Sequence, residues 1–175
     1  MKKILLTFAK QNQEANKTIA GILTGLSNED REKDRKSYYK SLSGLFCHNT
    51  GATVYFLNLM KDAVSGNSAA LKTLTPLAKY QDFKGRLTEE QWVQAVSFSK
   101  TADKAFIDFL NALEDKDFEA QVKIEWYKGK PPSTPLYFML EQLITHNLHH
   151  RGQISQILDS LKIENDYSGI NIKFC

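Results

Sequence analysis

The chain has 175 residues, of which 42% are apolar and 25% are charged, and its formal net charge is +3. These values fit one soluble globular domain or two small ones, and a chain of this length can form a hydrophobic core without disulfides or a structural metal. Nine glycines and four prolines are too few for a collagen-like, low-complexity or many-stranded β protein, and no basic stripe with interleaved aromatic residues indicates nucleic-acid binding.

The first predicted helix occupies the amino-terminal part of the chain and ends at about Leu26. Its apolar residues keep helical spacing, although Asn12 and Asn16 interrupt the inner face. Residues 1–6 open like a signal peptide, but polar residues soon interrupt the apolar run, so we interpret the segment as helix. The mixed charges at 29–36 predict a solvent-exposed helix start or loop.

A second helix is predicted over residues 38–63, where the period of 3.6 residues resumes. The apolar positions that define it are Leu42, Leu45, Ala52, Phe56 and Leu59. Residues 64–87 are less regular, and Pro76 and Gly85 within them predict a long connection with room for a short helix.

A capping box begins the third predicted helix, which spans about residues 89–114. The Thr88 side chain can accept a hydrogen bond from the backbone N–H of Gln91, whose side chain can accept from the Thr88 N–H. From Phe118 to Trp126 apolar and polar residues alternate, which predicts a strand or small hairpin after this helix.

The fourth helix is predicted over residues 135–162, with Thr134 as the N-cap and Pro135 at the first helical position. Apolar residues alternate again at 170–174, which predicts an extended tail against the helices. Four long amphipathic segments with one minor β element indicate an all-α chain, in which residues 1–175 form a single four-helix bundle.

The four histidines are unevenly distributed, and three of them occupy predicted core positions. His146 and His150 lie four residues apart, which puts both imidazoles on one face of the fourth helix. That face is the inward stripe formed by Met139, Leu143, Ile154, Ile157 and Leu161. His48 takes a similar position in the second helix, between Leu45 and Ala52.

Three imidazoles at core positions would be costly as unpaired polar groups, and a shared metal ion would satisfy all of them. The alternative is that each is a hydrogen-bonded core histidine, which is the usual role of a single helical histidine. The agreement with independently predicted apolar stripes favours the metal. His149 lies about 60° around the helix from His146, so we interpret it as a boundary residue and not a ligand.

Residues 146–153, with the sequence His-Asn-Leu-His-His-Arg-Gly-Gln, resemble the signature of the DinB-like family, bacterial metal-binding bundles that include low-molecular-weight-thiol transferases. Residues 46–49 are similar to the family's upstream histidine, and Asn12 and Asn16 resemble its paired asparagines in helix one. The resemblance implies a bundle in which the second and fourth helices are neighbours joined through a crossover. It also implies that the same three histidines are the metal ligands.

Three neutral nitrogen donors without an obvious fourth protein ligand leave a coordination position open to water or substrate, as in catalytic sites. Zn(II) and Ni(II) suit imidazole best, and Fe(II) and Mn(II) are also compatible. Bound water could serve hydrolysis, or a small thiol could bind as thiolate and attack an electrophile. The resemblance favours the thiol, which in bacteria implies bacillithiol, mycothiol or glutathione.

Neighbouring polar residues are candidates for contacts around the metal or the substrate. Those that could orient the imidazoles, although surface amides or caps are equally compatible, are Asn12, Asn16, Asn49, His149 and Gln153. Arg151 could bind an acidic substrate or form a structural ion pair. Cys47 is turned about 100° from His48 and is interpreted as a packing residue. No glutamate lies between His146 and His150 as in metalloproteases, which disfavours hydrolysis.

The function predicted from these features is metal-dependent transfer of a low-molecular-weight thiol to a small electrophile. A metal-dependent hydrolase and a noncatalytic metal-binding protein of a stress response are the alternatives. No apolar run approaches the roughly 20 residues that span a bilayer. Because Cys47 and Cys175 form no CxxC motif, we expect reduced thiols in a cytoplasmic protein. The resemblance implies a homodimer, with Trp92 or Tyr38–Tyr39 as candidate interface residues.

Overall fold

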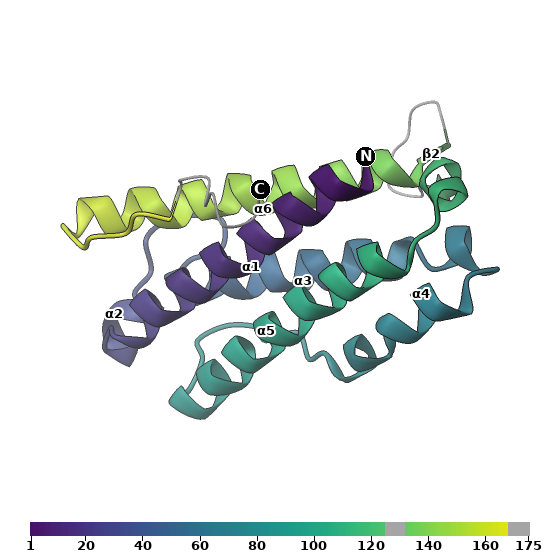
Figure 1. Cartoon of the computed structure of the whole chain (residues 1–175). Coiled ribbons are helices and arrows are strands. Elements are labelled where there is room, and N and C mark those ends of the chain that lie inside the picture. The colour runs from purple at the N-terminus through teal and green to yellow at the C-terminus, as the bar shows by residue number, and fades with distance from the viewer. Residues whose placement is uncertain (125–131, 168–175) are drawn as a thin grey trace.

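The computed structural model describes residues 1–124 and 132–167 (Figure 1). The four long helices in this part of the chain are α1 (Lys2–Thr24), α3 (Leu42–Leu59), α5 (Glu89–Ala112) and α6 (Leu136–Ser160). The α1 helix packs against α5 and α6, and α3 packs against the same two helices. The mostly helical fold is thereby confirmed, and the second and fourth long helices, α3 and α6, are in direct contact. Trp126 and the predicted tail at 170–174 lie outside the described residues.

Shorter elements connect the long helices. They are α2 (Asn28–Glu32), α4 (Ser68–Thr73) and the 3₁₀ helices η1 (Asp62–Val64), η2 (Thr75–Lys79) and η3 (Asp115–Glu119). The connection predicted over residues 64–87 therefore contains α4, which packs against α5 (Figure 1), and η2, which has Pro76 in its first turn. Within the described residues no helix combines the length and the hydropathy that crossing a membrane requires.

Capping side chains set where two of the long helices begin. Thr88 Oγ1 accepts the N–H of Gln91 at 3.2 Å and Gln91 Oε1 accepts the N–H of Thr88 at 2.9 Å, which confirms the predicted capping box of α5. Ser41 caps α3 by accepting the N–H of Gly44 at 3.0 Å. Because of this cap, the second long helix begins at Leu42 and not at residue 38.

The N-cap predicted for the fourth long helix is wrong. Pro135 and not Thr134 occupies the N-cap position of α6, and no side chain caps this helix. Thr134 belongs instead to β2 (Ser133–Pro135), where it pairs with Val122 of β1 (Gln121–Lys123) in an antiparallel ribbon. The ribbon confirms a small β element before α6, although each strand is shorter than the alternating run predicted from the sequence.

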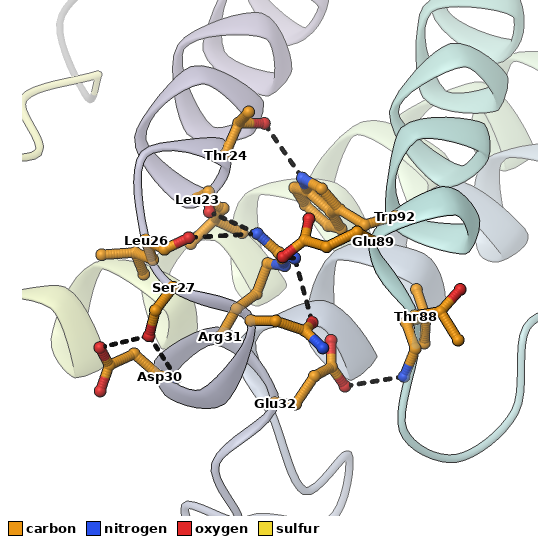
Figure 2. Close-up of polar contacts among 12 residues, drawn as sticks. Leu23, Thr24, Leu26, Ser27, Asp30, Arg31, Glu32, Thr88, Glu89 and Trp92 are labelled. Carbon is orange, nitrogen blue, oxygen red and sulfur yellow. Dashed lines mark hydrogen bonds and ion pairs between the residues drawn. The ribbon is translucent and has the colours of Figure 1, made fainter.

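The prediction that residues 29–36 are solvent-exposed is wrong for Arg31 and Glu32, which are buried. The Arg31 guanidinium lies 4.7 Å from the centroid of the Trp92 ring and 2.8 Å from the Glu89 carboxylate (Figure 2). The aromatic face and the carboxylate together offset the cost of burying this charge. Trp92 is itself only 1% exposed, so its indole is not available for the subunit interface suggested for it.

Hydrogen bonds to the backbone tie α2 to the two helices beside it (Figure 2). Arg31 donates to the carbonyl oxygens of Leu23 and Leu26, at 3.3 and 3.4 Å, where α1 ends. The Glu32 carboxylate accepts the N–H of Leu87, at 3.1 Å, just before α5 begins. Arg31 and Glu32 therefore hold the end of α1 and the start of α5 together.

Replacing Arg31 by alanine is expected to lower the free energy of unfolding by about 2 kcal/mol, because the carbonyls of Leu23 and Leu26 each lose a donor and the Trp92 face loses its cation. Replacing its partner by glutamine, in Glu89→Gln, is expected to cost less than about 1 kcal/mol, because Glu89 is largely exposed. Urea unfolding of both variants measures the two values. Equal losses would mean that the ion pair, and not the burial of Arg31, supplies the stability.

The hydrophobic core consists of two clusters separated by polar side chains. Along α1, one cluster includes Ala9 and the other begins at Ile19, and along α6 they are separated between Leu143 and Ile154. The side chains between the clusters form what we call the polar layer: Asn12, Asn16, His48, Asp103, His146, Asn147, His150 and Arg151. This layer crosses the middle of the bundle and contains the three histidines predicted at core positions.

Candidate metal centre

Three histidines of the polar layer converge between α3 and α6. His48 comes from α3, and His146 and His150 come from successive turns of α6. The Nε2 atom of His150 lies 3.1 Å from Nε2 of His48 and 3.2 Å from Nε2 of His146. One ligand atom from each histidine lies within 4.8 Å of the other two. The packing of α3 on α6 therefore brings together the three residues that the sequence placed on inward stripes.

Gln153 determines which nitrogen of His150 faces the other two rings. The Gln153 side-chain oxygen lies 2.8 Å from Nδ1 of His150, so Nδ1 carries the hydrogen and donates it. The Gln153 amide nitrogen lies 3.4 Å from Nε2 of His149, which agrees with this orientation of the amide. In neutral His150 the lone pair is therefore on Nε2, and it points at the cluster as a metal ligand requires.

The spacing and chemistry of the cluster fit a shared metal ion. Nitrogen ligands about 2.0 to 2.1 Å from one ion in tetrahedral geometry are about 3.3 to 3.4 Å apart, close to the two measured Nε2–Nε2 distances. The single lone pair on His150 Nε2 can accept a hydrogen from only one of its two imidazole neighbours. An ion accepts a lone pair from every ring, so the three histidines could hold one metal ion.

Burial keeps these imidazoles neutral at neutral pH. Desolvation lowers the pKa of His48 and the pKa of His146 to about 4 in each case, and the neighbouring His150 contributes in the same direction. Desolvation also lowers the pKa of His150, although its hydrogen bond to Gln153 acts in the opposite direction. Since neutral imidazole is the form that binds metals, the protein holds the three donors in their binding state.

Tyr39, from the loop before α3, contacts two of the three rings. Its ring is stacked on His48, with centroids 4.0 Å apart and an interplanar angle of 21°, and it meets His150 edge-on at 5.4 Å. Its hydroxyl oxygen, Oη, lies 2.8 Å from Nε2 of His48. From the sequence Tyr39 was only an interface candidate, because a tyrosine in a loop carries no periodic signal.

A cavity of about 1090 Å³ opens beside the cluster, and His48 and His146 form part of its wall. Apolar and aromatic side chains supply most of the rest, including Ala52, Tyr55, Phe56, Ile124, Phe138 and Met139. Among the described lining residues Asp82 is the one acid, and none is a lysine or an arginine. This volume and this lining are typical of a site for a small molecule.

The sequence model of the DinB family matches residues 1–161, which include all four long helices and the three histidines. The chain belongs to the DinB family. Comparison with curated proteins and with solved structures returned no match. The family match agrees with the resemblance noted at residues 146–153 and extends it over the whole bundle.

In this DinB chain, three other candidate residues belong to a hydrogen-bonded group that contains Asp103 and does not include the three histidines. Asn12 and Asn16 donate from Nδ2 to Oδ1 of Asp103, at 3.0 and 2.9 Å. Arg151 is buried and donates to the side-chain oxygen of Asn12. Its guanidinium therefore joins α6 to α1, and Arg151 is not among the described residues that line the cavity.

Asp103 is the acceptor at the centre of this second group, and sequence reasoning missed it. It is 4% exposed, and burial raises its pKa to about 7 although the Asn16 amide, the Arg151 charge and the Asn12 amide each lower it. The sequence pattern could have indicated Asp103, because it lies between Ala102 and Phe106 on the face of α5 that is buried. An acid on an apolar stripe requires polar partners, and two amides from α1 supply them.

The remaining candidates lie around the cluster without joining it. His149 is exposed and contacts Gln153, and Asn49 is buried with no hydrogen-bond partner for its side-chain oxygen in the described residues. Asn147, which sequence reasoning did not single out, donates to Thr53 Oγ1 at 3.1 Å. That bond crosses from α6 to α3 beside His146 and helps to fix the helix pair that carries the three histidines.

Cys47 lies next to His48 and forms part of the cavity wall, but it has the character of a packing residue. Its side chain is buried in the apolar cluster around Trp92. Burial raises the pKa of the Cys47 thiol to about 12, and the charges of Glu32 and Asp82 raise it as well. The thiol is therefore protonated at neutral pH, which makes it a poor nucleophile.

Proposed function

We propose that this DinB-family protein is a metal-dependent transferase that activates a low-molecular-weight thiol for attack on a small electrophile. The proposal rests mainly on the cluster of three neutral imidazoles, two of which, His48 and His146, form part of the wall of a cavity. Three protein nitrogens leave coordination positions for a substrate atom, which is the arrangement of catalytic and not of structural sites. Zn(II) or Ni(II) is the ion that we propose, with Fe(II) and Mn(II) as alternatives.

The histidines and their neighbours prepare the site before any substrate binds. His48, His146 and His150 are neutral, and Gln153 holds the His150 lone pair toward the cluster. A divalent ion bound there supplies Lewis acidity, which lowers the pKa of a coordinated thiol and favours the thiolate. The hydrogen bond from His150 to Gln153 and the bond from Asn147 to Thr53, which joins α6 to α3, limit the motion of the donors, so the sulfur would be presented in a fixed direction.

The cavity is the proposed site of the electrophile. Its described wall is largely apolar and aromatic, and the carboxyl group of Asp82 is its one acidic side chain. An uncharged, apolar or aromatic molecule would bury its surface there without leaving a charge unpaired. An electrophile that fills this cavity would displace water, which would otherwise compete with the thiol for the electrophile.

The proposal is tested with protein loaded with Zn(II) or Ni(II) and with its metal-free form. A thiol that binds the ion is expected to raise the melting temperature of the loaded protein alone, by mass action. The same thiol is then mixed with monobromobimane, an uncharged aromatic electrophile that becomes fluorescent on alkylating sulfur. Faster alkylation with the loaded protein supports a transferase. The noncatalytic metal-binding alternative is supported if the thiol does not raise the melting temperature of the loaded protein and the loaded protein does not accelerate the alkylation.

A further inference from the structure

The backbone of the loop before α3 determines where Tyr39 lies. Lys36 and Lys40 adopt left-handed φ angles of 58° and 66°, and the N–H of Arg35 donates to the carbonyl of Lys40 at 2.6 Å, which closes the loop. The Tyr39 carbonyl approaches Gly44 so closely that any side chain at residue 44 would collide with its oxygen. The contact between Tyr39 and the histidines is thus set by the chain path and not by a freely rotating side chain.

The hydrogen bond of Tyr39 uses the atom that a metal would need. Oη of Tyr39 lies 2.8 Å from Nε2 of His48, and Nε2 is the His48 atom that lies 3.1 Å from Nε2 of His150. A neutral imidazole nitrogen either carries a hydrogen or offers one lone pair. Whichever of the two groups donates, this hydrogen bond and a metal–Nε2 bond exclude each other.

A metal ion on His48 would therefore release the Tyr39 hydroxyl without moving it far. The described residues offer this hydroxyl no second hydrogen-bond partner. The stacking of the Tyr39 ring on His48 still holds the oxygen beside the ligand nitrogen. The nearest acceptor for its hydrogen is then a non-protein atom bound to the same ion.

We propose, on the basis of the proposed function, that Tyr39 is a positioning residue for the exogenous ligand of the metal centre. Its neutral hydroxyl donates a hydrogen bond to the thiolate sulfur, or to a water oxygen in the absence of thiol, on the ion held by His48, His146 and His150. A hydrogen bond to an anionic acceptor is stronger than one between neutral groups. Tyr39 therefore favours the bound thiolate and fixes the direction of its remaining lone pairs.

The test compares Tyr39→Phe with the unchanged protein and with Tyr38→Phe, after loading each with Co(II). The Tyr39→Phe variant keeps the stacked ring and lacks only the oxygen, whereas Tyr38 is 90% exposed and serves as the matched control. 2-Mercaptoethanol is titrated into each protein, and its thiolate is followed by sulfur-to-cobalt absorption. The Co(II) affinity is measured separately by competition with a chelating dye, and thermal unfolding verifies that all three proteins fold.

Loss of one hydrogen bond to an anionic acceptor is expected to weaken the binding of 2-mercaptoethanol by about ten-fold or more in Tyr39→Phe. The affinity for Co(II) is expected not to fall, because the lone pair of His48 no longer has a competing partner. Tyr38→Phe is expected to match the unchanged protein in both measurements. Equal thiol affinity in Tyr39→Phe and the unchanged protein would overturn the proposal. A parallel loss of Co(II) affinity would also overturn it, because Tyr39 would then be a ligand or a structural support. Failure of the unchanged protein to bind Co(II) would instead remove the proposed function itself.

Discussion

Replacing His146 by alanine is expected to abolish stoichiometric metal binding, whereas His149→Ala is expected to leave it intact. His146 contributes one of the three Nε2 atoms that lie together between α3 and α6. His149, three residues along the same helix, is exposed, and it contacts the Gln153 amide and the His150 ring without a ligand atom in the cluster. Removing a residue that merely supports a ligand typically lowers metal affinity by about 10- to 100-fold, so removing a ligand should lower it further.

Elemental analysis of the two purified variants after loading with Zn(II) or Ni(II) measures the outcome. The pair is well matched because both substitutions remove one imidazole from α6 and leave the rest of the helix unchanged. Thermal unfolding without metal controls for a general loss of structure, and His146→Ala should remain folded because His146 is only half-buried. Equal loss of metal in both variants, or retention in both, would show that the ligand set is misassigned.

The histidine cluster could be predicted from the sequence because the face of a helix on which a residue lies depends only on its spacing from nearby residues. A residue four positions after another on a helix shares its face in any tertiary context, so His146 and His150 had to lie together. The placement of His48 needed one more assumption, that the inward stripes of the second and fourth long helices face each other. The contact between α3 and α6 supplies that assumption.

Residues whose position depends on the path of a loop could not be predicted from the sequence in the same way. Tyr39 contacts His48 because Lys36 and Lys40 turn the chain with positive φ angles. Lysine in a sequence does not predict such a turn, because residues other than glycine rarely adopt a positive φ. The prediction that Arg31 is exposed was wrong for a similar reason. A run of mixed charges is typical of a solvated surface, and the burial of Arg31 depends on its contact with Trp92, which belongs to a helix distant in the sequence. In each case the deciding contact is long-range in the sequence or is set by the backbone.

The asparagines of α1 illustrate a third limit. Their interruption of the apolar face of the first helix was visible in the sequence, but a role beside the metal and a role as surface amides or caps were equally compatible with it. The family resemblance directed Asn12 and Asn16 toward the metal, but their partner is Asp103, 91 and 87 residues away. Only the packing of α1 on α5 determines that Asp103 is the partner of both asparagines.

Replacing Asp103 by asparagine is expected to make the protein more stable than the original near pH 7 but not near pH 4. Burial raises the pKa of Asp103 from 3.8 to about 7 in the folded protein, so the folded state keeps its proton where the unfolded state has lost it. As the pH rises from about 4 to about 7, the unfolded state is increasingly favoured, and the contribution of the neutral Asp103 carboxyl to the free energy of unfolding is lost. A difference of about three units between the pKa of Asp103 in the folded and in the unfolded state corresponds to about 4 kcal/mol in the free energy of unfolding.

Chemical unfolding of the original and of Asp103→Asn at several pH values from 4 to 7.5 measures this difference. Asparagine imitates the protonated acid and can still accept the hydrogen bonds of Asn12 and Asn16 through its side-chain oxygen. The histidines titrate in both proteins, so their contribution cancels in the comparison. If the stability of the original relative to Asp103→Asn instead increases with pH, the Arg151 charge, relayed through Asn12, keeps Asp103 ionised, and the pKa of Asp103 is lowered and not raised by folding.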